Sequence, residues 1–308
     1  MEKKHVGGQA VIEGVMMRAP RSIAIAVRKP NDEIVVKKER VHPLGERYPI
    51  LKWPILRGVI VLLESLVWGF KALTFSANAA VETTEVPAPP SVDGEERGEA
   101  KSKKKKEEIG GFTLALTLIF SIGIGIGLFI VLPAWLAGLI AKKNFAFNLI
   151  DGIIRLVLFL AYILVISRIG QIKRVFEYHG AEHKSIYAYE AGEELTVENV
   201  EKYSTLHPRC GTAFLLMVMF VSILVFAIFG KPPSLLVRFG TRIIFIPLIA
   251  GISYELTRLA SKKQDIWLMR VLIAPGLLMQ KFTTKKPSEE QLQVAIKALK
   301  EVLSMEEK

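Results

Sequence analysis

Hydrophobic residues are concentrated in long uncharged runs along the chain. The segments 109–141 and 210–230 contain no charged residue. A helix needs about 20 apolar residues to cross the core of a bilayer, so both runs are long enough to do so. The pattern predicts a mainly α, polytopic membrane protein with about four transmembrane helices. Their predicted positions are 112–141, 145–169, 212–229 and 235–256.

The segment 49–81 is apolar but carries a regular stripe of charges. Arg57, Glu64 and Lys71 lie seven residues apart, so a helix presents all three on one side. A charge at the middle of a bilayer costs about 2.5–3.5 kcal/mol. We therefore expect an interfacial amphipathic helix here, packed on the bundle, and not a further span.

The N-terminal segment 1–48 is predicted to be a small β-rich unit. The runs 22–27 and 33–37 have the residues of two strands, and the turn signal 29–32 between them predicts a hairpin. The stretch 8–17 is predicted to add a third strand.

Three further segments complete the predicted organisation. A charged, proline-containing linker occupies 82–108. The membrane domain, 109–263, contains a polar loop at 168–211. The last segment, 264–308, combines an interfacial apolar stretch broken at Pro275-Gly276 with an amphipathic helix, whose capping box begins at Ser288.

Composition and charge agree with a membrane protein. The chain of 308 residues is 51% hydrophobic, has a mean hydropathy of +0.34 and carries a net charge of +11. The basic run 101–106 next to the first span is better explained as a topology signal than as a specific nucleic-acid site. The positive-inside rule places both termini and the loop 168–211 in the cytoplasm of a multi-pass inner (plasma) membrane protein. One cysteine excludes an internal disulfide.

Candidate chemistry lies in the loop 168–211. His179, Glu182 and His183 form an H-x-x-E-H motif in a stretch expected to be a helix running on from the second span. Histidines four apart share a helix face and can bind one metal ion. Inverted zincin peptidases use this motif, but the match is only five residues long. Glu182 is a candidate catalytic base or a further ligand.

A second half of the site follows at His207 and Cys210, which are three residues apart. If all four His and Cys side chains bind a divalent metal, zinc first among the candidates, the site is closed and structural. If one ligand position stays open, the site is suited to catalysis. The alternatives are ordinary buried side chains, or a Cys210 nucleophile with His183 or His207 as its base.

Glu255 and Glu13 are further candidate catalytic carboxylates. Glu255 lies near the end of the fourth predicted span, where an ionisable residue is a functional candidate. Its alternative role is a salt bridge to Arg258. Glu13 lies among apolar residues, and the alternative to a catalytic role is that it is an ordinary exposed strand residue.

Several stretches along the chain match the pattern of one family. They are 7–18, Arg57-Gly58, Glu64-Ser65, 178–184, 189–193, 207–211, 251–255, 275–277 and Thr283-Thr284. On these stretches the chain resembles the YqhQ-like family of bacterial membrane proteins, described as predicted metal-dependent enzymes. The resemblance extends over nearly the full length and implies several spans and a metal. It supplies no substrate.

Two functions therefore compete. The first is a membrane metal-dependent hydrolase, acting at the cytoplasmic surface of the bilayer on a lipid, a lipid-linked intermediate or a peptide. The second is a non-catalytic scaffold or assembly factor, in which a structural metal holds the loop 168–211 and the C-terminal helix docks a membrane-protein partner.

Overall fold

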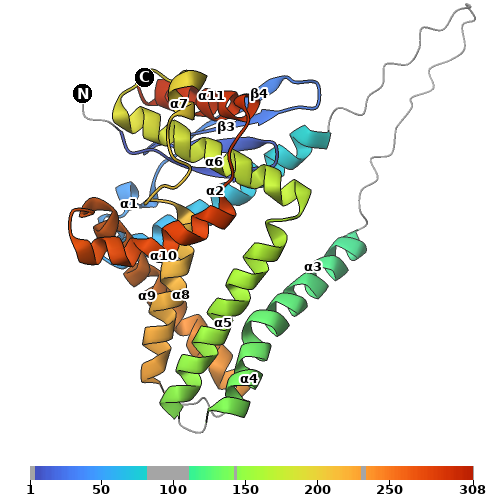
Figure 1. The fold of residues 1–308 in the computed structure, drawn as a ribbon, viewed down its shortest axis with the longest axis vertical. Helices are drawn as coiled ribbons and strands as arrows, with labels where there is room; N and C mark the ends of the chain where they lie inside the picture. Colours follow the sequence, from blue (N-terminus) through green and yellow to red (C-terminus); the bar gives the residue numbers. More distant parts are fainter. Residues whose placement is uncertain (1–3, 82–110, 142–143, 230–233, 308) are drawn as a thin grey trace, which may run out of the picture.

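The computed structural model describes residues 4–81, 111–141, 144–229 and 234–307. The predicted linker 82–108 lies outside the described residues. A four-stranded sheet with its covering helices forms a layer at one end of the molecule, and a bundle of long helices extends away from it (Figure 1).

The sheet is an antiparallel meander in the order β1-β2-β3-β4. The predicted hairpin is confirmed by β3 (Ser22–Arg28) and β4 (Ile34–Arg40). The stretch expected to be one further strand is instead two, β1 (Gly7–Val11) and β2 (Gly14–Arg18). The chain reverses between them at Glu13, whose φ of 50° is a turn conformation that pattern alone did not indicate.

Both faces of the sheet are covered by helices. Alternate residues of β3 point to opposite sides. Ala24 and Ala26 pack with α11 (Glu289–Glu306), whereas Ile23 and Ile25 pack with α2. The capping box at Ser288 is confirmed. Because the apolar face of α11 is buried here, it does not offer the docking surface that the scaffold hypothesis expected.

Helix α2 (Leu56–Val81) runs across the end of the bundle beneath the sheet (Figure 1). Its three striped charges all have partners in the protein. Arg57 pairs with Glu255, Glu64 pairs with Arg18, and the ammonium group of Lys71 lies 4.1 Å from the ring centroid of Trp68. Arg57 and Glu64 therefore tie α2 to the rest of the chain, whereas Lys71 is exposed and its partner Trp68 belongs to α2 itself.

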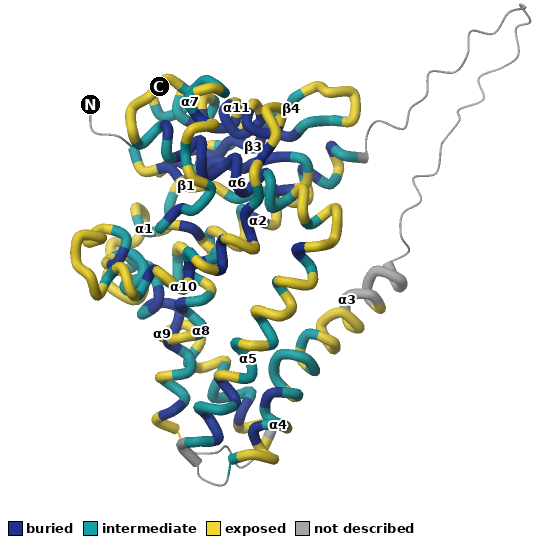
Figure 2. Tube along the Cα trace, viewed as in Figure 1, coloured by how far each residue is buried: buried dark blue, intermediate teal, exposed yellow. Residues whose placement is uncertain are grey.

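Within the described residues, five helical segments are long and apolar enough to cross a membrane. Four overlap the predicted spans, and the fifth belongs to α2. Their outward faces are exposed (Figure 2), with Phe120 and Ile244 at 70% and 73% exposure, as expected of surfaces that contact lipid. The five segments are Leu56–Ala80, Ile119–Ile140, Ala146–Ile166, Gly211–Ile228 and Leu236–Lys262.

The bundle is built from α3 to α5 and α8 to α10. α3 continues through a π-helical turn, η2, into α4. The bounds are α3 (Gly111–Ile126), η2 (Gly127–Val131), α4 (Leu132–Ile140), α5 (Asn144–Ile166), α8 (Gly211–Ile228), α9 (Leu235–Lys262) and α10 (Trp267–Thr283). The shorter elements are α1 (Leu44–Arg47), η1 (Pro49–Lys52) and α7 (Val197–Glu201).

Two details of the predicted helices were wrong. α6 (Gly170–Ala191) does not run on from α5, because a turn at 167–169 redirects the chain into the sheet layer. The Pro275-Gly276 pair does not break α10, which is continuous. Gly276 lies directly against Ala213 of α8, so close packing supports α10 where proline removes a hydrogen bond.

An ion cluster lies inside the bundle. The predicted pair Asp151–Arg155 is confirmed, with 2.9 Å between its charged atoms. Asp151 also accepts from Arg238 and Arg242 of α9, and only 1% of Asp151 is exposed. One carboxylate therefore links α5 to α9.

Candidate metal centre

Helix α6 and the start of α8 bring three potential metal ligands together. His179 and His183 lie one turn apart on α6, with 4.4 Å between their ring centroids. Cys210 immediately precedes α8, and its Sγ lies 3.1 Å from Nε2 of His179. The ligand atoms of these three residues all lie within 4.8 Å of one another, and all three side chains are buried. The trio could therefore hold a metal ion.

Backbone carbonyls orient both histidines. Nδ1 of His179 lies 2.8 Å from the carbonyl oxygen of Thr283, and Nδ1 of His183 contacts that of Thr205. Because a carbonyl only accepts, each Nδ1 carries the proton and each Nε2 presents a lone pair. Among the described residues, the buried Nε2 of His183 has no hydrogen-bond partner. Metal-ligating histidines usually have this arrangement, so the residues fit a metal.

Cys210 is held at the start of α8. It is the N-cap residue of this helix, and its sulfur accepts a hydrogen bond from the backbone N–H of Thr212 at 3.4 Å. The positive end of a helix stabilises an adjacent negative charge, including that of a metal-bound thiolate. Two imidazoles and one thiolate form a donor set typical of zinc.

Burial keeps His183 in the form that a metal needs. Only 1% of this residue is exposed, and burial lowers the pKa of its imidazole. A neutral ring leaves Nε2 unprotonated, which ligation requires.

Glu182 lies beside the trio. Its Oε2 is 3.9 Å from Nε2 of His179 and 3.8 Å from Nε2 of His183. Burial raises the pKa of this carboxyl, although His179 and His207 nearby oppose the rise. The backbone N–H of Gly8 in β1 donates to the carboxylate. A Cβ at Gly8 would come within 2.6 Å of Cγ of Glu182, so glycine permits this approach.

Gly180 permits a second close approach. A Cβ there would lie 2.1 Å from the carbonyl oxygen of Lys285. The segment after α10 crosses α6 at this point, and the backbone N–H of Lys285 donates to the carbonyl of Phe176 at 2.9 Å. This crossing is what brings the Thr283 carbonyl to His179.

The structure leaves His207 outside the trio. Its Nδ1 accepts from the backbone N–H of Arg209 at 3.2 Å, so the proton of the neutral ring lies on Nε2, which is 3.5 Å from Oε2 of Glu190. Burial also lowers the pKa of this ring. The buried side chain of Gln280 holds the His207 backbone through two hydrogen bonds, of 2.7 and 2.8 Å.

The two remaining candidate carboxylates pair with arginines elsewhere. Glu13 accepts from Arg174 at 2.6 Å, and Glu255 accepts from Arg57 at 2.6 Å. Glu255 therefore forms its ion pair with α2, and not with Arg258 of its own helix. Neither carboxylate belongs to the His/His/Cys trio.

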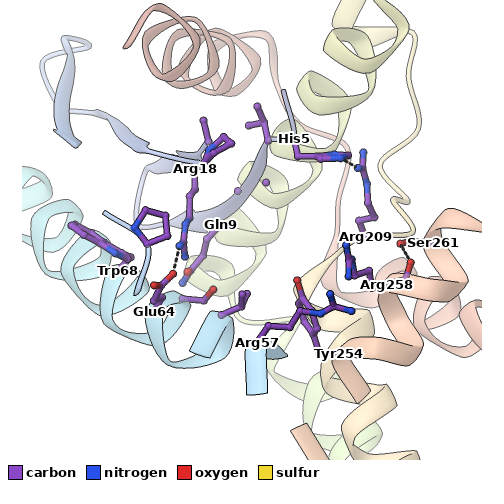
Figure 3. Close-up of a pocket in the computed structure, with 18 of the residues that line it drawn as sticks. His5, Gln9, Arg18, Arg57, Glu64, Trp68, Arg209, Tyr254, Arg258 and Ser261 are labelled. Atoms are coloured by element: carbon purple, nitrogen blue, oxygen red, sulfur yellow. Dashed lines mark hydrogen bonds and ion pairs between the residues drawn. The ribbon is translucent and has the colours of Figure 1, made fainter. Parts of the chain in front are cut away.

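A cavity of about 960 Å³ adjoins this centre. It lies between β1, β2, α2, the loop before α8 and the C-terminal part of α9. Figure 3 shows side chains from these elements directed toward one space. Gly8 and His207 line the cavity, and both lie beside the centre, because Gly8 contacts Glu182 and the ring of His207 lies 5.6 Å from that of His183.

Several residues that build the centre could not be found by motif. Thr205 and Thr283 contribute only backbone carbonyls, which every residue possesses. Gln280 acts from a helix distant in sequence. Gly8 and Thr283 do have a sequence signal, since both belong to stretches that carry the family resemblance.

Comparison with known proteins identifies the family. The sequence model of the family described as "Protein of unknown function (DUF1385)" matches residues 53–305. The chain is also 37% identical over 304 residues to "Uncharacterized protein YqhQ" of Bacillus subtilis (strain 168), covering 97% of this chain and 92% of that protein. No solved structure matches. The chain therefore belongs to the DUF1385 family, and the predicted resemblance is confirmed. Neither match names a metal or a reaction.

Proposed function

We propose that this DUF1385 member is an integral membrane, metal-dependent hydrolase. His179, His183 and Cys210 would hold a divalent metal, zinc by its donor chemistry. The observation that carries the proposal is the convergence of these three donors beside a buried carboxylate, with Oε2 of Glu182 within 3.9 Å of both imidazole Nε2 atoms.

Three protein ligands favour catalysis over a purely structural role. Structural zinc sites use four protein ligands, whereas catalytic sites use three and keep one position open. The metal would supply Lewis acidity at that position. Glu182 would take a proton from the attacking water at Oε2 and pass it to the leaving group, and the burial that raises its pKa makes it a stronger base than an exposed carboxylate. The Gly8 amide would orient the carboxylate.

The surroundings support a reaction at the membrane surface. The centre lies at the end of the bundle, in the layer that also contains β1 and α11 (Figure 1). We place this layer in the cytoplasm, because lysines and arginines are most frequent in the segments flanking the spans on this side. Glu13 and Glu255 we assign to positioning, since each pairs with an arginine.

One observation favours the competing structural role. All three ligands are no more than 9% exposed, as is Glu182, which could serve as a fourth ligand and close the site. A closed site of this kind would hold the loop 168–211 in a non-catalytic scaffold.

Substitution of Glu182 separates the two roles. Purified, zinc-loaded protein and its Glu182→Gln variant would be incubated with total membrane lipid and with membrane peptides, and each mixture analysed by mass spectrometry. We expect a species consumed by the wild type, roughly 10²–10⁴-fold more slowly by Glu182→Gln with its metal retained. Glu198→Gln, an exposed carboxylate on α7, is the matched control and should keep wild-type turnover. Equal turnover in Glu182→Gln, or no turnover in the wild type, contradicts the hydrolase.

A further inference from the structure

The walls of the cavity beside the metal centre carry an excess of positive charge. Among the described residues that line the cavity are six lysines and arginines but only two glutamates. Its volume of about 960 Å³ is at the upper end of the usual range for small-molecule sites. The six cations are Arg18, Lys52, Arg57, Arg209, Arg258 and Lys262.

Among the described residues, half of these cations form no close ion pair, although Arg258 still acts electrostatically on Glu255. Three pairs account for the others: Arg18–Glu64, Arg57–Glu255 and Arg209–Glu190. Among the described residues, Lys52, Arg258 and Lys262 form no ion pair within 4.0 Å. Arg258 is half-buried, so its charge is only partly compensated by water. Such a charge is stabilised by an anionic ligand.

The cations come from different elements and face one space. Arg57 is on α2 and Arg258 is on α9, while Arg18 extends from β2 and Arg209 from the loop before α8 (Figure 3). Guanidinium groups bind phosphate oxygens through paired hydrogen bonds, and several around one space can surround a phosphate group.

One wall of the cavity is apolar and belongs to α2. Ile60, Val61 and Trp68 of α2 line it. The same helix exposes Leu66 and Phe70, at 62% and 74%, away from the cavity lining. A molecule with an anionic head and an apolar tail could therefore lie with its head in the cavity and its tail along α2.

We propose that this cavity binds the phosphate-bearing head group of a membrane amphiphile, which is the substrate of the hydrolase. The inference rests on the proposed function, since it names the substrate class for that site. Gly8 and His207 line the cavity and also lie beside Glu182 and His183, so a bound head group lies next to the metal centre.

Binding can be measured without turnover. Full-length protein in a non-ionic detergent would be titrated with short-chain phosphatidic acid, following the fluorescence of Trp68 against a Trp68→Phe variant and confirming affinities by calorimetry. Short-chain diacylglycerol lacks the phosphate, and inorganic phosphate and pyrophosphate lack the tail. Metal-stripped protein and Glu182→Gln would be titrated alongside, so that binding is scored even if no metal or reaction is found.

We expect Arg258→Gln plus Lys262→Gln to weaken phosphatidic acid binding at least tenfold. Arg258→Lys in a protein that keeps Lys262 retains both positive charges and should bind phosphatidic acid nearly as tightly as wild type. The matched control is Lys263→Gln plus Lys281→Gln, two exposed lysines outside the cavity lining, which should stay within twofold of wild type. Inorganic phosphate or pyrophosphate binding as tightly as the lipid would keep the anion site but overturn the membrane source. Diacylglycerol binding as tightly as phosphatidic acid, or no loss in the double variant, would overturn the proposal.

Discussion

Gly180→Ala tests whether the crossing of α6 by the segment after α10 builds the metal centre. Alanine is a better helix former than glycine by about 1 kcal/mol, so helix propensity alone predicts a more stable protein. In the structure, however, the new Cβ would lie 2.1 Å from the carbonyl oxygen of Lys285. A backbone atom cannot rotate away as a side chain can, so the segment 283–285 must move by about 1 Å to reach ordinary contact distance.

The cost of that movement follows from what the segment holds. Overpacking costs about 1–3 kcal/mol. The hydrogen bonds from Lys285 to Phe176 and between His179 and Thr283 contribute about 1 kcal/mol each. Partial loss of both, less the gain in helix propensity, gives a net loss of about 2 kcal/mol. For a chain of 308 residues, we expect the melting temperature to fall by roughly 3 °C.

Gly170→Ala is the matched control, because it makes the same change on the same helix where nothing lies within 4 Å of the new Cβ. Both variants would be melted in detergent at one scan rate, followed by tryptophan fluorescence, and their metal content would be measured. Loss of the Thr283 contact should weaken metal binding roughly 10–100-fold in Gly180→Ala alone. A Gly180→Ala protein as stable as Gly170→Ala, with its metal intact, would refute the reasoning.

Three further changes test other parts of the structure. Gly8→Ala should displace Glu182 and lower turnover at least tenfold with metal retained. Gly7→Ala, whose new Cβ meets open space, is the control and should keep wild-type turnover. Equal rates of the two variants in an activity assay would argue against the Gly8–Glu182 contact. Gln280→Leu leaves the backbone N–H and C=O of His207 without their buried partner and should cost about 2 kcal/mol in a melting experiment, and an unchanged melting temperature would rule out that role. Asp151→Asn removes the charge shared by three arginines and should lower the free energy of unfolding by about 3–5 kcal/mol. The exposed Asp265→Asn is the control. A loss of stability no larger than in the control would show that the cluster does not hold α5 to α9.

The sequence was sufficient where structure depends on local pattern. Uncharged runs predicted the bundle helices because burying backbone groups in lipid demands long apolar helices. Ser288 marked the start of α11 because its capping box is a contact between residues three apart. His179 and His183 could be paired for the same reason, since one helical turn separates them.

The rest depended on contacts between distant segments. Nothing local distinguishes His207 from Cys210 as a ligand, because contacts of His207 with Arg209, Glu190 and Gln280 decide that it lies outside the trio. Arg57 and Glu255 are 198 residues apart, so their pairing was not visible as a spacing. Long-range packing fixes such choices, and a single sequence does not record it.

The central claim is that His179, His183 and Cys210 form one metal site, and metal analysis of purified protein tests it most directly. Three proteins would be expressed with zinc: wild type, His183→Ala and the control His42→Ala, whose residue lies outside the trio. Their bound zinc would be measured by inductively coupled plasma mass spectrometry. We expect about one zinc per chain in wild type and His42→Ala, and a large loss in His183→Ala. Wild-type protein without bound metal, or His183→Ala with the wild-type amount, would contradict it.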